Sequence, residues 1–189
     1  MAQKENQRIA LTKKLLQEGL LRLLETKTLD RISVTELCRE SGINRATFYN
    51  HYNSPQELLA SIEGKIVDDI RTMITPSVSS ADIVAIVEAV CAYFFENART
   101  VLTLHACGAD EQITAVLYEF NRNYQLIRLN DKFARYAPRA RQEGLHLITT
   151  FFYIGCYHLI LEWLAKDINA TPKEIATLMV LLAKENFLE

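Results

Sequence analysis

Apolar residues recur at steps of three and four along almost the whole chain, with no convincing strand pattern between these stretches. In the segment from about residue 6 to residue 26, Ile9, Leu16 and Leu20 fall on one stripe, which is the period of an amphipathic helix. Comparable patterns predict further helices near residues 54–74, 80–96, 98–106, 110–134, 138–166 and 172–187. The pattern therefore predicts an all-α protein.

Two shorter helices are predicted between the first stripe and residue 54 from their end signals. Ser33 followed by Glu36 is the S-x-x-E signature of a helix start. Gly42 then permits the positive φ that a tight turn needs, and Asn44 is a favoured residue for beginning the next helix. Residues 33–52 are thus predicted to form a helix-turn-helix, with its second helix running to the end of this segment.

The Pro/Ser-rich stretch 76–80 is the best candidate for a domain boundary. We expect a three-helix head in residues 1–53, a connecting helix in residues 54–75 and a larger helical body in residues 76–189. The head holds nine Lys and Arg against six Asp and Glu, a net charge of +3, whereas the rest of the chain carries −5. A positive head favours a polyanionic partner.

The second helix of the helix-turn-helix has an unusual outer face. Phe48 is bulky and marks the core side, so Ala46 and Asn50 are expected to point away from the core. Lys and Glu normally dominate a solvated helix, whereas small and amide side chains suit the DNA major groove, where Asn pairs with adenine and Ala touches a thymine methyl. The alternative is a helical hairpin that packs on another protein surface.

The segment ISVTELCRESGINRATFYNHYNSPQELL resembles the DNA-binding signature of TetR-family transcriptional regulators, and the similarity extends over about residues 8–65. In that family a fourth helix connects the DNA-binding head to a ligand-binding body. The resemblance and the outer-face argument together predict these DNA-contacting residues: Thr35, Arg45, Ala46, Thr47, Tyr49, Asn50 and His51.

One position departs from the family pattern. The family usually has a Lys at the start of the fourth helix, whereas this chain has Pro55 followed by Gln56. One phosphate contact should then be missing, which lowers the salt dependence of DNA binding by about one unit of slope. The backbone N–H groups at this helix start remain candidates for holding a phosphate. The departure also leaves open a TetR-fold adaptor that binds proteins and has weak or lost DNA binding.

The helix predicted at residues 138–166 is apolar nearly all round. One stripe satisfies packing within its own domain, so the other faces need a second partner. The resemblance implies a homodimer formed by the last two helices, which presents two recognition helices about 34–36 Å apart to a palindromic operator. The expected interface residues are Phe151, Ile154, Gly155, His158, Leu178 and Leu182.

The body is also rich in aromatic residues with polar tips. Such side chains suit a cavity for a small apolar or aromatic effector, although ordinary core packing is the alternative for each of them. The residues expected to line the cavity are His105, Tyr118, Tyr124, Phe152 and Tyr153. The resemblance implies a repressor that such an effector releases from DNA.

Other classes of protein lack support in the sequence. The four cysteines are far apart, which favours reduced thiols over a metal site or disulfides. No catalytic motif or Gly-rich phosphate loop is present, so neither enzymatic activity nor a cofactor is expected. We expect a cytoplasmic protein, because no signal peptide is evident and His146, His158 and Glu162 interrupt the most apolar segment.

Overall fold

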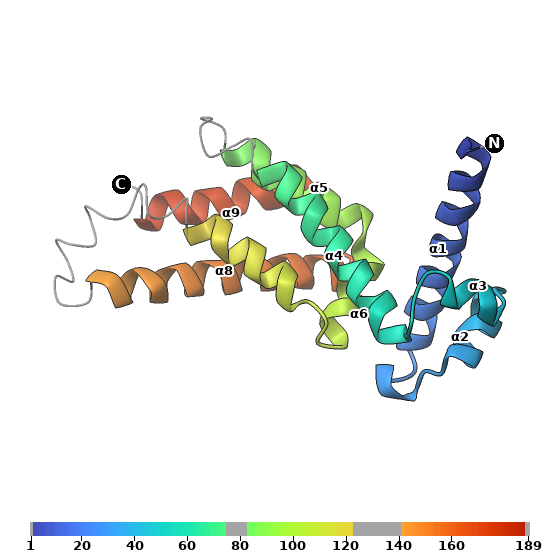
Figure 1. Ribbon diagram of the computed structural model, residues 1–189. Coiled ribbons are helices and arrows are strands. Elements are labelled where there is room, and N and C mark those ends of the chain that lie inside the picture. The colour runs from blue at the N-terminus through green and yellow to red at the C-terminus, as the bar shows by residue number, and fades with distance from the viewer. Residues whose placement is uncertain (1, 75–82, 123–140, 188–189) are drawn as a thin grey trace. The chain divides into compact units, whose positions relative to one another are not determined.

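The computed structural model describes residues 2–74, 83–122 and 141–187, and within these ranges the chain is helical with no strand (Figure 1). This confirms the predicted all-α fold. The elements are α1 (Ala2–Leu24), the 3-10 helix η1 (Leu29–Arg31), α2 (Val34–Ser41), α3 (Arg45–Tyr49), α4 (Pro55–Ile74), α5 (Ile83–Glu96), α6 (Ala98–Ala106), a helix of residues 111–122, α8 (Arg141–Ala165) and α9 (Pro172–Phe187).

Some boundaries differ from those predicted. The second helix of the helix-turn-helix, α3, ends at Tyr49 rather than at residue 52, because the His51 N–H donates to the carbonyl of Phe48, only three residues back, at 2.9 Å. This arrangement closes a turn instead of extending the helix. The far end of the helix predicted at 110–134, and the predicted boundary at 76–80, lie outside the described residues, so the proposed domain division stays a prediction.

The chain forms two compact units, and the first holds residues 1–65 together with residues 103–110. In this head unit the C-terminal half of α1 packs beside α2 and α3 (Figure 1) and buries Leu16 and Leu20 completely. The backbones of α1 and α2 come close at one point, where a Cβ added to Gly19 would lie 3.0 Å from the Cβ of Ser41. A glycine at position 19 is therefore what allows the two helices to approach.

The helix-turn-helix has the predicted cap at each helix start. The Ser33 hydroxyl accepts a hydrogen bond from the Glu36 N–H at 3.2 Å, and the Asn44 side chain accepts one from the Thr47 N–H at 2.7 Å. Gly42 has a φ of 69°, a conformation that costs glycine least. Caps of this kind stabilise a helix by roughly 1 kcal/mol each, so they fix the short α2 and α3.

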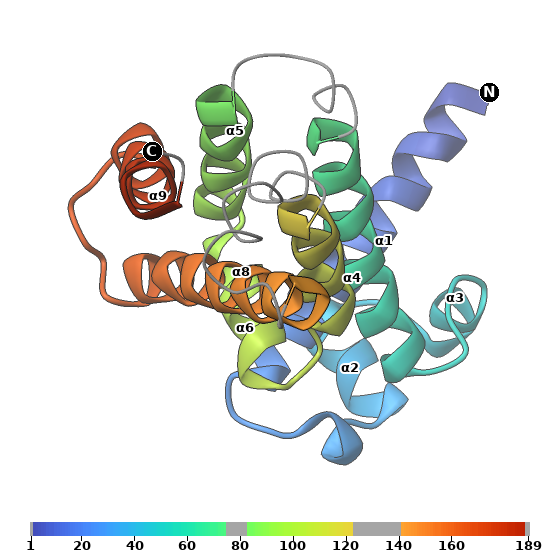
Figure 2. The ribbon, with the colours of Figure 1, turned by 90° about the vertical axis from the view of Figure 1, so that its left-hand side faces the viewer.

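The second unit comprises residues 66–102 and 111–189. In this body unit α9 packs mainly along α5, and Figure 2 shows α9 end-on while α8 runs across the view, so these two helices cross. Trp163 is buried near the end of α8, and its indole N–H donates to the carbonyls of Ile168 at 3.2 Å and Ala170 at 3.1 Å. Phe95 stacks on Trp163 at 5.2 Å. The indole thus holds the turn between α8 and α9 by its hydrogen bonds and contacts α5 through the stacked Phe95 ring.

Helix α4 belongs to both units, because the division falls after Lys65. Its C-terminal part is joined to α5 within the body by a hydrogen bond that the Tyr93 hydroxyl donates to Asp69 Oδ2 at 2.7 Å. Burial, this hydrogen bond and the Asp69 charge all raise the pKa of Tyr93. The phenol therefore stays protonated and remains a donor at neutral pH.

Candidate nucleic-acid interface and body cavity

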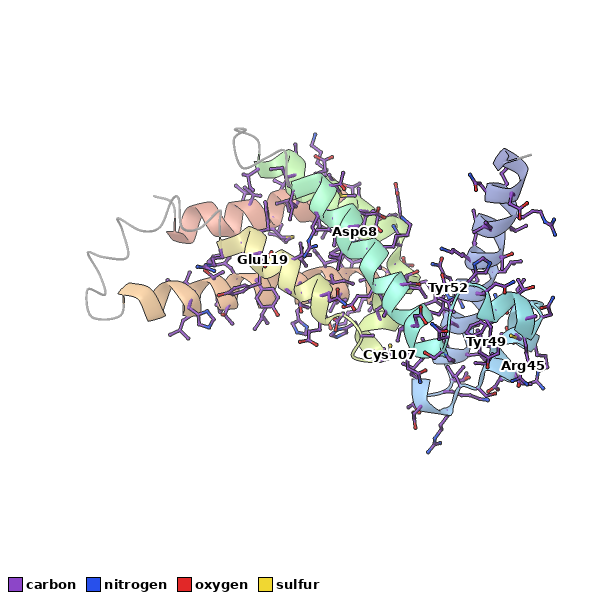
Figure 3. The ribbon with its side chains drawn as sticks, in the orientation of Figure 1. Arg45, Tyr49, Tyr52, Asp68, Cys107 and Glu119 are labelled. Carbon is purple, nitrogen blue, oxygen red and sulfur yellow. The ribbon has the colours of Figure 1, made fainter. Side chains whose placement is uncertain are left out.

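The outer face of α3 is bare within the head unit. Arg45, Ala46 and Asn50 are exposed, and 49% of Tyr49 is accessible to solvent. Figure 3 shows the side chains of Arg45 and Tyr49 on this short helix. An exposed surface of one cation, one amide, one phenol and one methyl group combines a phosphate-binding charge with groups that can contact base edges.

The inner side of α3 holds this face in place. Phe48 is completely buried, and its ring meets that of Tyr49 edge to face, with the centroids 5.5 Å apart. The same ring lies 6.1 Å from that of Tyr52, which is also buried. Edge-to-face aromatic pairs stabilise one relative orientation, so the buried Phe48 limits where the exposed phenol can lie.

The remaining predicted contact residues lie around this face. Thr35 is exposed in the first turn of α2, and Thr47 is half-buried. His51 is half-buried, with its ring centroid 6.4 Å from that of Tyr52. The structure thus brings the residues of α3 together on one side, and it places His51 in the turn that follows.

Three cations of the head differ in whether they form an ion pair with a carboxylate of the head. Arg22 donates from Nε to Glu40 Oε1 at 2.6 Å, and Lys27 pairs with Glu36, so these two cations join elements within the head. Arg45 forms no ion pair with any residue in the described part of the chain. Of these three cations, Arg45 is therefore the one whose charge remains available to an external anion.

The start of α4 carries a negative group. Pro55 is buried, and the Glu57 carboxylate accepts hydrogen bonds from the backbone N–H of Asn53 at 2.7 Å and from its amide at 2.8 Å. These bonds lower the pKa of Glu57. The Glu57 N–H is itself bonded to the Ser54 hydroxyl at 3.2 Å. An ionised carboxylate in this first turn opposes the binding of a phosphate there.

The body unit exposes a different kind of surface. Six large apolar side chains of α8 and α9 have more than 40% of their area accessible: Leu147, Phe151, Ile154, Leu178, Leu181 and Leu182. Phe151 is the most exposed of them, at 70%. The two helices also border one depression of about 480 Å³, with Phe151 and Gly155 on α8 and Leu182 on α9 among its walls.

The predicted interface residues all lie on these two helices. Gly155 is exposed, and nothing lies within 4 Å of a Cβ added to it. His158 is exposed one turn further along α8. Their role in dimerisation remains a prediction, because the structure contains a single chain.

A second, smaller cavity of about 80 Å³ lies within the body unit and is partly open to solvent. Phe152 and Tyr153, which were expected in an effector cavity, are among its lining residues, whereas Tyr118 and His105 are not among the described ones. Tyr118 instead forms a 2.7 Å hydrogen bond with His146, and its ring meets that of Tyr153 edge to face.

Besides Phe152, Tyr153 and Tyr118, the residues expected in the cavity were His105 and Tyr124. His105 belongs to the head unit, where its Nδ1 lies 2.8 Å from Asp110 Oδ2. Tyr124 lies outside the described residues.

Several residues that line this cavity were not predicted from the sequence. Cys91 on α5, Asn121 on the helix of residues 111–122, and Cys156 on α8 all contribute to its wall, as does Met179 on α9. Periodicity marks each of these positions only as facing some part of the core. Their meeting around one space depends on how four separate helices pack.

The segment 146–165 of α8 is long and apolar enough to cross a membrane by length and composition, and 33% of the tested segment is buried in the body unit. The same segment lies within the region that matches a known protein family. A family model described as the transcriptional regulator C-terminal region of TetR proteins matches residues 82–185, which include all of it. The match covers more than half of the chain.

Solved structures provide a second comparison. A TetR transcriptional regulator from Streptococcus agalactiae 2603V is 14% identical, with a TM-score of 0.61 over 96% of this chain and 98% of that one. A transcriptional regulator from Pseudomonas aeruginosa PAO1 is 19% identical, with a TM-score of 0.59 over 92% of this chain and 88% of that one. The dihydroxyacetone kinase operon activator DhaS is 18% identical, with a TM-score of 0.52 over 94% and 98% of the two chains.

No match was found among curated proteins. At these identities the solved structures show a shared fold and no more. The family model goes further, because it matches the sequence itself from the start of α5 into α9. The chain belongs to the TetR family of transcriptional regulators.

Proposed function

We propose that the protein is a cytoplasmic repressor that binds a palindromic operator as a homodimer and leaves the DNA when a small effector binds in its body. The observation that carries this proposal is the bare outer face of α3, with Arg45, Ala46 and Asn50 exposed together. Asn50 is suited to a bidentate contact with adenine, and Ala46 to a thymine methyl. Arg45 and Tyr49 supply contacts to phosphate or to base edges.

The homodimer is supported by the exposed apolar surface of α8 and α9. Apolar surface left in water costs free energy in proportion to its area, about 25 cal/mol per Å². A second copy of the same surface is a self-complementary way to cover it, as in the isologous interfaces of twofold dimers. Twofold symmetry also explains why a palindromic operator is expected.

The effector part of the proposal rests on the cavity of the body unit. Ligand binding shifts a regulator only if the ligand has different affinities for the DNA-binding and the released state. Cavity residues on α5 lie about one turn from Tyr93, which holds α4 through Asp69. Because α4 continues into the head, this contact gives ligand binding a physical route to α4.

The operator is tested by selecting bound sequences from random duplexes with the purified full chain. We expect a palindromic site whose half-sites lie one helical turn apart, at about 34–36 Å. Arg45→Ala and Asn50→Ala should each weaken binding to that site about tenfold or more, because a good base or phosphate contact contributes about 1–3 kcal/mol. Matched controls are Arg122→Ala and Asn169→Ala, which remove the same side chains from exposed positions in the body.

The same experiment decides between a regulator that binds DNA and a protein-binding adaptor. The adaptor is favoured if no duplex is enriched while Arg45→Ala still binds its protein partner normally. The direction of regulation needs a reporter placed behind the selected operator, because DhaS, of similar fold, is named as an activator. Lower expression with the protein than without it supports repression, whereas higher expression contradicts it.

A further inference from the structure

The body cavity has a wall with no charged group among the described residues that line it. Its described lining comes from α5, the helix of residues 111–122, α8 and α9, and these described residues include no Lys, Arg, Asp, Glu or His. An ionised ligand would lose part of its hydration against this wall without gaining an opposite charge from the described lining residues, which weakens its binding. The lining therefore selects against anions and cations.

Two cysteine thiols belong to this wall. Burial raises the pKa of Cys91 to about 12 and that of Cys156 to about 11. Both groups remain neutral thiols at physiological pH, so they behave as small apolar side chains. The wall is thus uncharged as well as largely apolar.

The polar groups of the wall are few. Asn121 contributes the only side-chain amide among the described lining residues, and its Nδ2 donates to the Leu117 carbonyl at 3.0 Å. This bond uses the amide nitrogen and fixes the side chain, which leaves the amide oxygen as an acceptor. Tyr153 and Tyr157 add phenol groups to the wall. A ligand with one O–H or N–H donor would therefore complement the Asn121 oxygen.

The size of the cavity limits the ligand. Its volume of about 80 Å³ is roughly half that of an engineered apolar cavity of about 150 Å³ that binds benzene. Met179 lies on its wall and also lines the 480 Å³ depression between α8 and α9. Because methionine is unbranched and adapts its shape, movement of Met179 toward the depression can enlarge the cavity to the size of a single ring.

We propose that this cavity binds compact, uncharged, mainly apolar molecules that carry one hydrogen-bond donor, which the Asn121 side-chain oxygen accepts. The inference rests on the proposed function in one respect only, which is that such a molecule would be the effector. The chemistry of the cavity can be tested without DNA.

The test titrates the full-length protein by calorimetry with phenol, benzene and benzoate, three probes that share one ring. We expect phenol to bind about fivefold more tightly than benzene, because one hydrogen bond contributes about 1 kcal/mol, and we expect no measurable binding of benzoate. Asn121→Leu should reduce phenol affinity about fivefold to the level of benzene, while leaving benzene affinity nearly unchanged. Asn169→Leu, an equivalent change at an exposed position, should leave both affinities unchanged.

A second variant keeps the test decisive if Asn121→Leu does not fold. Val87 lines the cavity from α5, so Val87→Phe should fill the space and abolish binding of both phenol and benzene. The inference is overturned if benzoate binds as tightly as phenol, if neither neutral probe binds, or if Val87→Phe leaves phenol binding intact.

A gel shift with the selected operator separates this inference from the proposed function. If phenol binds in the cavity but leaves the DNA complex unchanged, the cavity chemistry stands and the effector part of the proposed function loses its support. If the protein binds its operator and no neutral probe enters the cavity, the cavity inference fails alone.

Discussion

The head and the body each expose a helical face that their own unit does not cover, and the two faces differ in chemistry. On α3 and its C-cap the exposed groups are small or polar, with Arg45 and Ala46 in the five-residue helix and Asn50 directly after it. On α8 the exposed groups are large and apolar, with Leu147 66% and Phe151 70% accessible. One chain thus exposes two surfaces of different chemistry.

The difference indicates what each face is suited to meet. A polar face loses little in water, so it can remain bare until a polyanion arrives, and charge then steers the encounter. An apolar face of this size is costly in water and is typical of permanent association. The head is therefore suited to a reversible partner, and the body to one that is always present.

The largest effect is expected from placing a charge on the apolar face. In Phe151→Asp the new carboxylate would be buried against the second copy without an opposite charge, which costs about 3–5 kcal/mol. We expect the dissociation constant of the dimer to rise at least about 100-fold, as measured by sedimentation equilibrium. Operator affinity should fall with it, because a monomer contacts only one half-site.

Ile168→Asp is the matched control for this change. Ile168 is 48% exposed in the turn after α8 but does not line the depression between α8 and α9. This variant should remain a dimer. A Phe151→Asp protein that also stays dimeric at low concentration would show that the two faces do not differ as proposed.

A smaller effect is expected where α1 meets α2 in the head. In Gly19→Ala the new Cβ would lie 3.0 Å from the Ser41 Cβ and 3.3 Å from its Cα and N, atoms that cannot rotate away. Overpacking of this kind costs about 1–3 kcal/mol, so the free energy of unfolding should fall by that amount in urea denaturation.

Gly64→Ala is expected to have the opposite sign, since nothing lies within 4 Å of its added Cβ and the residue is inside α4. Alanine is more favourable than glycine in a helix by about 0.5–1 kcal/mol. If both variants shift stability in the same direction, the close approach of α1 and α2 is not what constrains position 19.

A third loss of stability is expected when a tyrosine of the body loses its hydroxyl group, but not when a tyrosine of the head does. Tyr93→Phe removes the hydrogen bond to Asp69 and should lower the free energy of unfolding by about 1.5 kcal/mol, the lower end of the contribution of a bond to a charged group, because Tyr93 is only half-buried. Tyr49→Phe, on the exposed face of α3, should leave stability unchanged. Equal losses in the two variants would contradict this distinction.

The pH dependence of stability tests the same contact. Because the folded protein raises the pKa of Tyr93 above its ordinary value near 10, the stability from this group is fully present below pH 10. It is lost as the pH rises toward the raised value. The wild-type chain should therefore lose more stability above pH 10 than Tyr93→Phe does.

The sequence predicted the head more completely than the body for a physical reason. Caps, the turn glycine and the outer face of α3 depend on residues within a few positions of one another, so Ser33, Gly42 and Asn44 identify them directly. The 3-10 helix at Leu29–Arg31 was missed because three residues are too few to show a period. The contact of Gly19 with Ser41 was missed because it joins residues far apart in the chain.

The residues that line the cavity could be predicted only in part from the spacing of apolar positions. Phe152 and Tyr153, two of the residues expected in an effector cavity, are on its wall, but Asn121 and Met179 come from other helices. A pattern of apolar positions states that a residue faces the interior, and it does not state which helices meet there. The aromatic rings at Tyr118 and Tyr153 pack against each other, so an excess of aromatic residues does not distinguish a cavity from a filled core.

The smallest effect is expected at the start of α4, where this chain lacks the lysine usual in the family. Gln56 is exposed beside the buried Pro55, so Gln56→Lys places a cation next to the proposed DNA face without disturbing the core. Operator binding should gain one phosphate contact, and the slope of log affinity against log salt should steepen by about 0.9.

Asn169→Lys adds the same charge at an exposed position in the body and should leave the slope unchanged. If both lysines steepen it equally, net charge rather than a contact near α3 governs binding. If neither does, the Glu57 carboxylate in the same turn offsets the added charge, and Gln56→Lys combined with Glu57→Gln should then restore the expected slope.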